Sequence, residues 1–298
     1  MDVPCEDLGY LNTRDHPNGA EDKRFVEELW RRCHTFVDSN IREDARNHFH
    51  QRFWEMYLAV TLLEQGFDLQ PHVAEGPDFC AIVGKCRIWF EATAPGPGIT
   101  PDQVPVPPEL DQDFELIPTE KILLRFTNAL DVKRKKYDAA LEKGIISTDD
   151  SYILAINSRG IPRARYTSGL PYFIQAFLPF GLPAVSIDGK TRKIIETIYQ
   201  YRSEVSKLTG SPVSTRAFLD DEASFCSAVL HSGVDSANYP DQLGGDFAVL
   251  QNPNARRPLG AAVFQWCEQF TFLDDQLHRS KPNPAVNKDA PQAASQLR

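Results

Sequence analysis

The stretch GPDFCAIVGKCRIWFEAT, residues 76–93, decides the fold of this chain. A Gly-Pro break precedes the largely apolar run 78–83, and a Gly-Lys pair joins that run to a second one, 86–93. Runs of this length with apolar and β-branched residues, separated by two turn-forming residues, are typical of an antiparallel hairpin. The stretch therefore predicts two paired strands that begin directly after a turn.

The segments on either side of the hairpin predict further elements of an α/β domain. Apolar residues recur at helical spacing before and after it, and short, nearly continuous apolar runs are typical of buried strands. The expected order is helix, three strands, helix and strand, which predicts a mixed central β-sheet flanked by helices. The expected helices cover residues 21–40, 42–65 and 119–143, and the additional strands cover 67–73 and 151–157.

No linker divides the chain before its C-terminal end. We therefore expect a single α/β domain over 1–277, with a core at about 42–158 and an elaboration at about 159–277 that includes strands at 184–188 and 193–198. A tail rich in Pro, Asn, Ala, Gln and Lys predicts disorder over 278–298. The expected loops are a polar one at 1–20 and a Pro-rich one at 94–118 that leaves the hairpin directly.

Composition excludes several classes of protein. The chain has 298 residues, 42% of them hydrophobic and 24% charged, which is typical of a folded protein rather than a disordered one. No apolar run approaches a membrane span of about 20 residues, and the first residues do not resemble a secretory signal. Six cysteines without a Cys-x-x-Cys pair favour reduced thiols and a cytoplasmic location. The net charge of −9 disfavours nucleic-acid binding by bulk charge but permits a local basic groove.

Three acidic residues occupy informative places around the hairpin. Asp78 begins one arm, and Glu91 lies near the end of the other arm. In an antiparallel hairpin these two positions lie across from each other, so their carboxylates are expected to converge. Glu55 lies on the predicted helix 42–65, next to a partly apolar face that would direct it inward. Two carboxylates are a suitable set of ligands for Mg²⁺.

At these residues the chain resembles the PD-(D/E)XK nuclease superfamily, which has a restriction-endonuclease-like core. The resemblance covers about residues 42–158 and includes an acid on a helix, Gly-Pro-Asp-Phe at 76–79 and Phe-Glu-Ala-Thr at 90–93. It implies that Asp78 and Glu91 hold Mg²⁺, with Mn²⁺ as a substitute, and that Glu55 completes or orients the site. It also implies a nucleic-acid substrate, with DNA favoured over RNA.

The chain departs from the pattern of the superfamily at one position. Thr93 stands where the motif has a lysine, and threonine cannot supply a positive charge. Some members of the superfamily carry this lysine on another element. On the predicted helix 119–143, angular spacing places Lys133 inside the apolar stripe, where an unpaired cation would be costly. Lys133 is therefore the candidate for the displaced lysine, with Arg125 and Lys136 beside it to bind phosphate.

The sequence thus favours a Mg²⁺-dependent endonuclease, with Glu55, Asp78, Glu91 and Lys133 as its catalytic residues. The alternative is a catalytically inactive nuclease fold that binds nucleic acid or a protein partner, and Thr93 keeps this alternative open. Each residue also has a purely structural interpretation. Asp78 could simply form the turn before the strand. The aliphatic part of the Lys133 side chain could pack on apolar groups while its amine reaches water. The pattern leaves the oligomeric state open, a dimer included.

Overall fold

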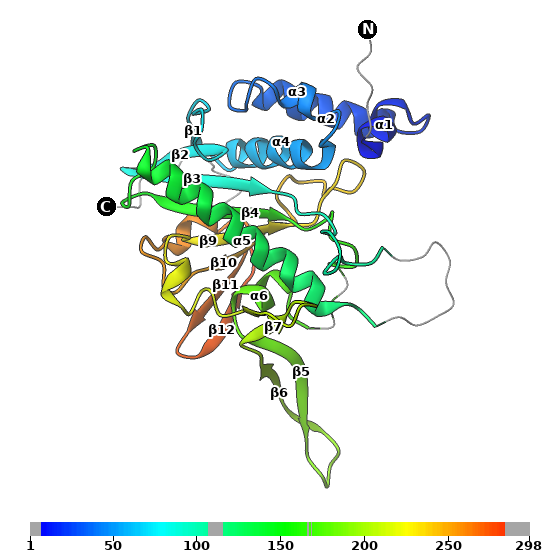
Figure 1. The fold of residues 1–298 in the computed structure, drawn as a ribbon, viewed down its shortest axis with the longest axis vertical. Helices are drawn as coiled ribbons and strands as arrows, with labels where there is room; N and C mark the ends of the chain where they lie inside the picture. Colours follow the sequence, from blue (N-terminus) through cyan, green and yellow to red (C-terminus); the bar gives the residue numbers. More distant parts are fainter. Residues whose placement is uncertain (1–6, 107–115, 166, 168, 284–298) are drawn as a thin grey trace.

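The computed structural model describes residues 7–106, 116–165, 167 and 169–283 (Figure 1). The helices are α1 (Leu8–Asp15), α2 (Ala20–Cys33), α3 (Ile41–Asp44), α4 (Phe49–Glu64), α5 (Thr119–Glu142) and α6 (Tyr172–Phe177). The strands of the first half are β1 (Asp68–Leu69), β2 (Phe79–Val83), β3 (Cys86–Thr93) and β4 (Ser151–Asn157). Those of the second half are β5 (Phe180–Ile187), β6 (Ile194–Tyr201), β7 (Glu204–Ser206), β8 (Pro212–Ser214), β9 (Ala228–Ser232), β10 (Ala248–Gln251), β11 (Glu268–Leu273) and β12 (Gln276–Ser280).

A mixed sheet of eight strands forms the centre of the protein, in the order β1-β2-β3-β4-β9-β10-β11-β12. The hairpin β2–β3 is antiparallel, whereas β3, β4 and β9 run parallel to one another. Two parallel neighbours need a crossover connection, and α5 is the helix that returns from β3 to the start of β4. The prediction of a mixed α/β fold with a central sheet between helices is confirmed.

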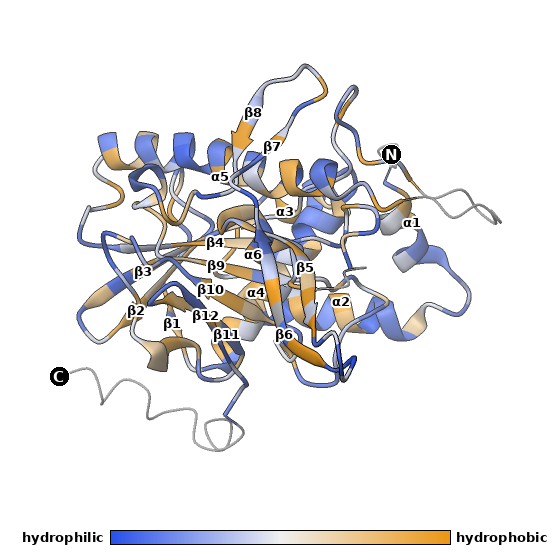
Figure 2. Cartoon of the chain, turned by 90° about the horizontal axis from the view of Figure 1, so that it is seen from below, coloured by the Kyte–Doolittle hydropathy of each residue, from blue (hydrophilic) through white to orange (hydrophobic). Residues whose placement is uncertain are grey.

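Helices cover both faces of this sheet (Figure 1). Successive residues of β3 face opposite layers. Phe90 and Ala92 pack in the same core as α2 and α4, whereas Trp89 packs in the core beneath α5 and α6. The strands are coloured mostly as hydrophobic and α5 as a mixture of polar and apolar residues (Figure 2). This amphipathic pattern explains why α5 lies flat on the sheet. It also directs Glu91, which alternates with Phe90 and Ala92, towards α5.

The N-terminal region differs from the sequence prediction. The expected helix 42–65 is interrupted, because α3 ends at Asp44 and α4 begins only at Phe49. The backbone N–H of Phe49 donates to the carboxylate of Asp7, which also caps α1. Residues 8–15 form that helix, so the prediction of a loop over 1–20 is wrong there, and residues 1–6 lie outside the described part. The predicted helix 21–40 ends early, at Cys33.

Other boundaries also differ. Of the predicted strand 67–73, only Asp68–Leu69 forms a strand, and the backbone N–H of Gln70 donates to the carbonyl of Cys80 beyond it. The predicted tail begins too early, since β12 continues to Ser280 and pairs with β11 at the edge of the sheet. The rest of that tail, from residue 284, lies outside the described residues, as do residues 107–115 of the predicted Pro-rich loop. None of the described helices combines the length and apolar character that a membrane span requires.

Stability should depend on pH through His231 in β9. Its ring stacks on Phe173 at 4.6 Å between centroids, Nε2 lies 2.8 Å from Oγ of Ser158, and burial lowers its pKa to about 4. An unfolded histidine takes up a proton near pH 6.5, so the unfolded state binds more protons between these values and stability falls as pH drops. We expect a loss of about 2 kcal/mol from this residue between pH 7.5 and 4.5. Urea unfolding of wild type and His231→Gln should show a smaller pH effect in the variant, and equal effects would contradict this assignment.

Candidate active site

Glu91 is the centre of a cluster of charged side chains at the end of β3. Its side chain is 1% exposed and faces α5, and Oε1 accepts from two lysine amines. One is Lys133, and the other is Lys136, whose Nζ lies 3.0 Å away. The two amines stabilise this buried carboxylate, because burial of an unpaired charge costs several kcal/mol.

The two lysines differ in environment. Lys133 lies on the side of α5 that faces the sheet, as helical spacing predicted, and its side chain is only 12% exposed. Its amine also donates to the backbone carbonyl of Ala92, at 3.2 Å. The side chain of Lys136 is 58% exposed and reaches Glu91 from the surface of the helix. Lys133 is therefore the enclosed cation of the cluster, and Lys136 is the one in contact with solvent.

Asp78 lies beside Glu91, at the start of the neighbouring strand. The last ladder pair of the hairpin is Phe79 with Phe90, so Asp78 is one position further along, across from Glu91. Its Oδ2 accepts from the backbone N–H of Ala92 at 2.7 Å. Burial, followed by the nearby carboxylates of Glu91 and Glu55, raises the pKa of Asp78 to about 8. Asp78 and Glu91 are thus neighbours across the hairpin, and the carboxylates of Glu91 and Glu55 both act on Asp78.

Glu55 is buried on α4, and side chains of the same helix pair with its carboxylate. Arg52 donates to both of its carboxylate oxygens, at 2.8 and 2.7 Å, and Gln51 donates to Oε1 at 2.8 Å. Gln51 also accepts from the N–H of Ala94 at 2.7 Å, so it links Glu55 to the end of β3. Sequence reasoning did not assign a role to Gln51 or Arg52. Their i−4 and i−3 spacing from an inward-facing glutamate is the signal that would have found them.

A cavity of about 180 Å³ opens beside these side chains. It lies between α4, the start of β2 and α5. Seven of its lining residues are charged or titratable: Asp38, Arg52, Glu55, His72, Glu75, Asp78 and Lys136. Its walls come from elements that approach from both faces of the sheet. Glu55, Asp78 and Lys136 are the members of the cluster that line it.

Arg125 does not lie with the carboxylates. Its Nε donates to the carbonyl of Gly96, at 3.0 Å, in the segment that follows β3. Lys121, further towards the start of α5, donates to the carbonyls of Pro101 and Gln103. These two basic residues therefore hold the segment after β3 against the helix. The structure brings together Glu55, Asp78, Glu91, Lys133 and Lys136, and leaves Arg125 about two helical turns away along α5.

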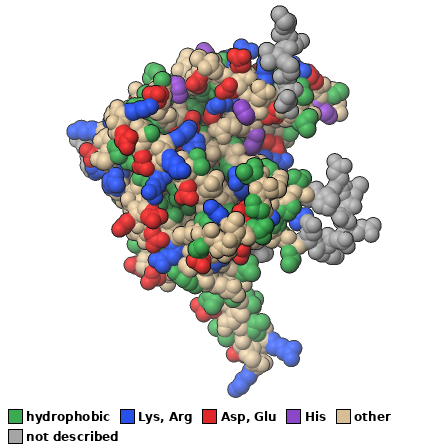
Figure 3. Space-filling model, viewed as in Figure 1, with side chains coloured by type: hydrophobic (Ala, Val, Ile, Leu, Met, Phe, Trp, Pro, Cys, Tyr) green, Lys and Arg blue, Asp and Glu red, His purple; other side chains and the backbone are tan. Residues whose placement is uncertain are grey.

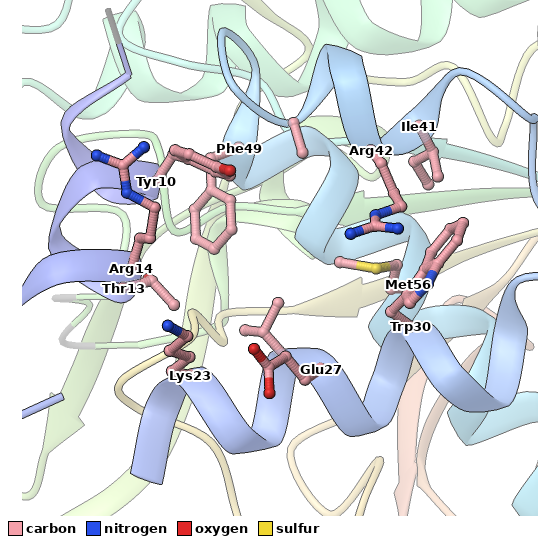
Figure 4. Close-up of a pocket in the computed structure, with 12 residues that line it drawn as sticks. Tyr10, Thr13, Arg14, Lys23, Glu27, Trp30, Ile41, Arg42, Phe49 and Met56 are labelled. Atoms are coloured by element: carbon pink, nitrogen blue, oxygen red, sulfur yellow. The ribbon is translucent and has the colours of Figure 1, made fainter. Parts of the chain in front are cut away.

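A second cavity, also of about 180 Å³, lies among the N-terminal helices (Figure 4). Aromatic and aliphatic side chains such as Trp30, Phe49 and Met56 line it, and Arg14 and Arg42 lie at its rim. Glu27 is the only acid in its lining. This cavity has no pair of carboxylates and is separate from the acidic cluster.

The acidic cluster has a donor set that fits Mg²⁺. Among the described residues, no three side chains of His, Cys, Asp or Glu gather as a metal-ligand group. Mg²⁺, however, usually takes only one or two protein carboxylates and keeps several waters. Asp78 and Glu91 supply two, and the carbonyl of Ala92 lies beside them.

Comparisons of the chain with protein-family models, with curated proteins and with solved structures find no match. The functional argument therefore depends on the residues of this site and on their geometry.

The unequal burial of the two lysines predicts unequal effects on stability. Lys133→Met leaves Glu91 with only a solvent-exposed partner and should lower the free energy of unfolding by about 3 kcal/mol. Lys136→Met should lower it by less than about 1 kcal/mol, since exposed ion pairs contribute little. The double variant Glu91→Gln/Lys133→Met removes both buried charges and should recover most of the loss. Urea unfolding measures all three, and equal losses from the two lysine variants would disprove the assignment.

Proposed function

We propose that this protein is a divalent-metal-dependent nuclease that hydrolyses phosphodiester bonds, with DNA as the favoured substrate. The observation that carries the proposal is the convergence of Asp78, Glu91 and Lys133 at the end of one hairpin. Two carboxylates with a lysine amine among them match the chemical needs of phosphodiester hydrolysis. That reaction requires a site for a cation, a group to orient water and positive charge near the phosphate.

Each side chain of the cluster has a role that follows from its contacts. Asp78 and Glu91 would hold Mg²⁺ or Mn²⁺, which supplies a Lewis acid for the phosphate when bound. The Lys133 amine, fixed by Glu91 and the Ala92 carbonyl, is positioned to orient a water molecule or offset negative charge. Lys136 is exposed beside it and can contact a phosphate group of the substrate. Gln51 and Glu55 hold the end of β3 in place.

Lys133 could also replace the lysine that the motif has at the position of Thr93. Thr93 occupies the strand position and cannot carry charge, but the amine of Lys133 comes from α5 to the same end of β3. This placement supports the migration of the lysine from strand to helix that the resemblance to the PD-(D/E)XK superfamily suggested. The restriction-endonuclease-like core is part of the same proposal.

A nuclease assay tests the proposal directly. Wild-type protein should cut plasmid or single-stranded DNA with Mg²⁺ or Mn²⁺ and should not cut with EDTA. Asp78→Asn and Glu91→Gln should each lower the rate by about a thousandfold, because each removes a carboxylate from the cation site. Glu64→Gln is the control, because this acid is the last residue of α4 and pairs with Arg32 rather than with the cluster. Cutting that persists in EDTA or in both acid variants would contradict the proposal.

The role of Lys133 has a separate test. Under conditions in which circular dichroism shows the variants to be folded, Lys133→Met should abolish cutting, whereas Lys136→Met should retain measurable activity. The reason is that only the Lys133 amine contacts both Glu91 and the carbonyl of Ala92. If Lys133→Met kept full activity, Lys133 would not be the catalytic amine.

The alternative function is an inactive nuclease fold that binds nucleic acid. One observation favours it: both lysines pair with the same oxygen of Glu91, Oε1, so that oxygen is already occupied in this conformation. Binding of DNA with a steep dependence on salt, together with no cutting in any metal, would support this alternative. Metal-dependent cutting by wild type would exclude it.

A further inference from the structure

The cavity among the N-terminal helices is a second place at which a ligand can bind. Its walls come from α1, α2, α3 and α4, and its volume is about 180 Å³ (Figure 4). Successive residues of α4 point to different sides of that helix: Glu55 belongs to the acidic cluster, whereas Met56 lines this cavity. An occupant of the cavity is therefore a different molecule from the substrate of the acidic cluster.

The walls of the cavity are mostly hydrophobic, and three of the residues in them are aromatic: Tyr10, Trp30 and Phe49. Ile41, Phe49 and Met56 are no more than 6% exposed and belong to the core that α2 and α4 share with the sheet, so packing fixes this side of the cavity. An apolar cavity of about 150 Å³ holds one benzene ring. This cavity therefore has room for a single aromatic ring with a short substituent.

The charged residues of the lining leave an excess of positive charge. Arg14, Lys23 and Arg42 are basic, whereas Glu27 is the only acid. Arg14 pairs with Asp15, which lies outside the lining, so two cations remain against one carboxylate. The whole chain, in contrast, has a net charge of −9. A local positive excess in an acidic protein favours an anionic ligand, and one negative charge balances it.

Arg42 is placed to receive that negative charge. Its guanidinium carbon lies 5.4 Å from the centre of the Trp30 ring, beside an aromatic wall of the cavity. Its side chain forms no hydrogen bond or ion pair with another residue in the described part of the chain. A guanidinium over a ring can still donate through its N–H edge, which fits a carboxylate with two parallel hydrogen bonds. Arg42 and Phe49 lie on opposite sides of the cavity (Figure 4), so a ligand between them contacts both.

We propose that this cavity binds a small aromatic carboxylate, with its ring between Trp30 and Phe49 and its carboxylate on Arg42. The volume limits the body of the ligand to about one ring, the apolar walls favour an aromatic body, and the charge of the rim favours a monoanion. The β5–β6 hairpin also exposes apolar side chains (Figure 3), but they lie on a two-stranded ribbon rather than around an enclosed volume. This inference does not depend on nuclease activity.

A titration with phenylacetate, followed by NMR, tests the proposal. Met56 lines the cavity and is one of only two methionines, so its ¹³C-labelled methyl signal reports binding at this place. The probes 2-phenylethanol and acetate keep only the ring or only the charge. Wild type should bind phenylacetate at least tenfold more tightly than either, because only phenylacetate engages both the walls and Arg42. Equal affinities for the three probes, or a Met56 signal that phenylacetate does not shift, would overturn the proposal.

The contribution of the charge has its own variant. Arg42→Gln should weaken the binding of phenylacetate by about tenfold and leave that of 2-phenylethanol unchanged, because only the carboxylate loses its partner. Arg31→Gln is the matched control, because this arginine of α2 pairs with Glu28 and lies outside the lining. It should bind phenylacetate as wild type does. Equal losses from the two arginine variants, or none from Arg42→Gln, would contradict the assignment of Arg42.

A further variant fills the cavity instead of changing its charge. Val26 lines the cavity from α2, and Val26→Phe adds a ring in the space that the ligand would take. With its fold verified by circular dichroism, this variant should lose the shift of the Met56 signal on addition of phenylacetate. A folded Val26→Phe that binds phenylacetate with wild-type affinity would also overturn the proposal.

Discussion

The ion pair between Glu91 and Lys133 is the interaction on which the rest of the site depends. A carboxylate that is 1% exposed and a lysine that is 12% exposed lie between a sheet and a helix, where each alone would be unstable. A hydrophobic pair would fill this space at lower cost. The chain instead places a second acid and a second lysine around them. Charged groups that are costly to bury and that gather in one place are found most often at functional sites, although structural ion-pair networks also occur.

The topology of the sheet brings these side chains together through a few short connections. The hairpin register sets Asp78 across from Glu91, and this relation follows from a single two-residue turn. The parallel pairing of β3 with β4 requires a crossover, so α5 must cross the face of the sheet to which Glu91 points. Lys133 then needs only the correct angular position on that helix. Helix α4 covers the opposite face and brings Glu55 and Gln51 to the same end of β3.

Local patterns in the sequence predicted the parts of the structure that local forces determine. The hairpin and α5 follow from turn residues and from apolar periodicity, and the angular position of Lys133 follows from the same periodicity. The break between α3 and α4 could not be predicted in this way, since Asp7, more than forty residues earlier, bonds to the N–H of Phe49. Strand β12 was missed because its exposed, polar residues resemble a tail, and only pairing with β11 makes it a strand. Arg125 was expected beside Lys133, but its partner is Gly96, in a segment whose path the sequence did not reveal.

The most direct test of this account is a crystal of the wild-type protein soaked in Mn²⁺, with data collected for anomalous scattering from the metal. The account predicts one anomalous peak within coordination distance of carboxylate oxygens of both Asp78 and Glu91. A fully soaked crystal with no peak there, in which Lys133 and Lys136 both still contact Glu91, would contradict it.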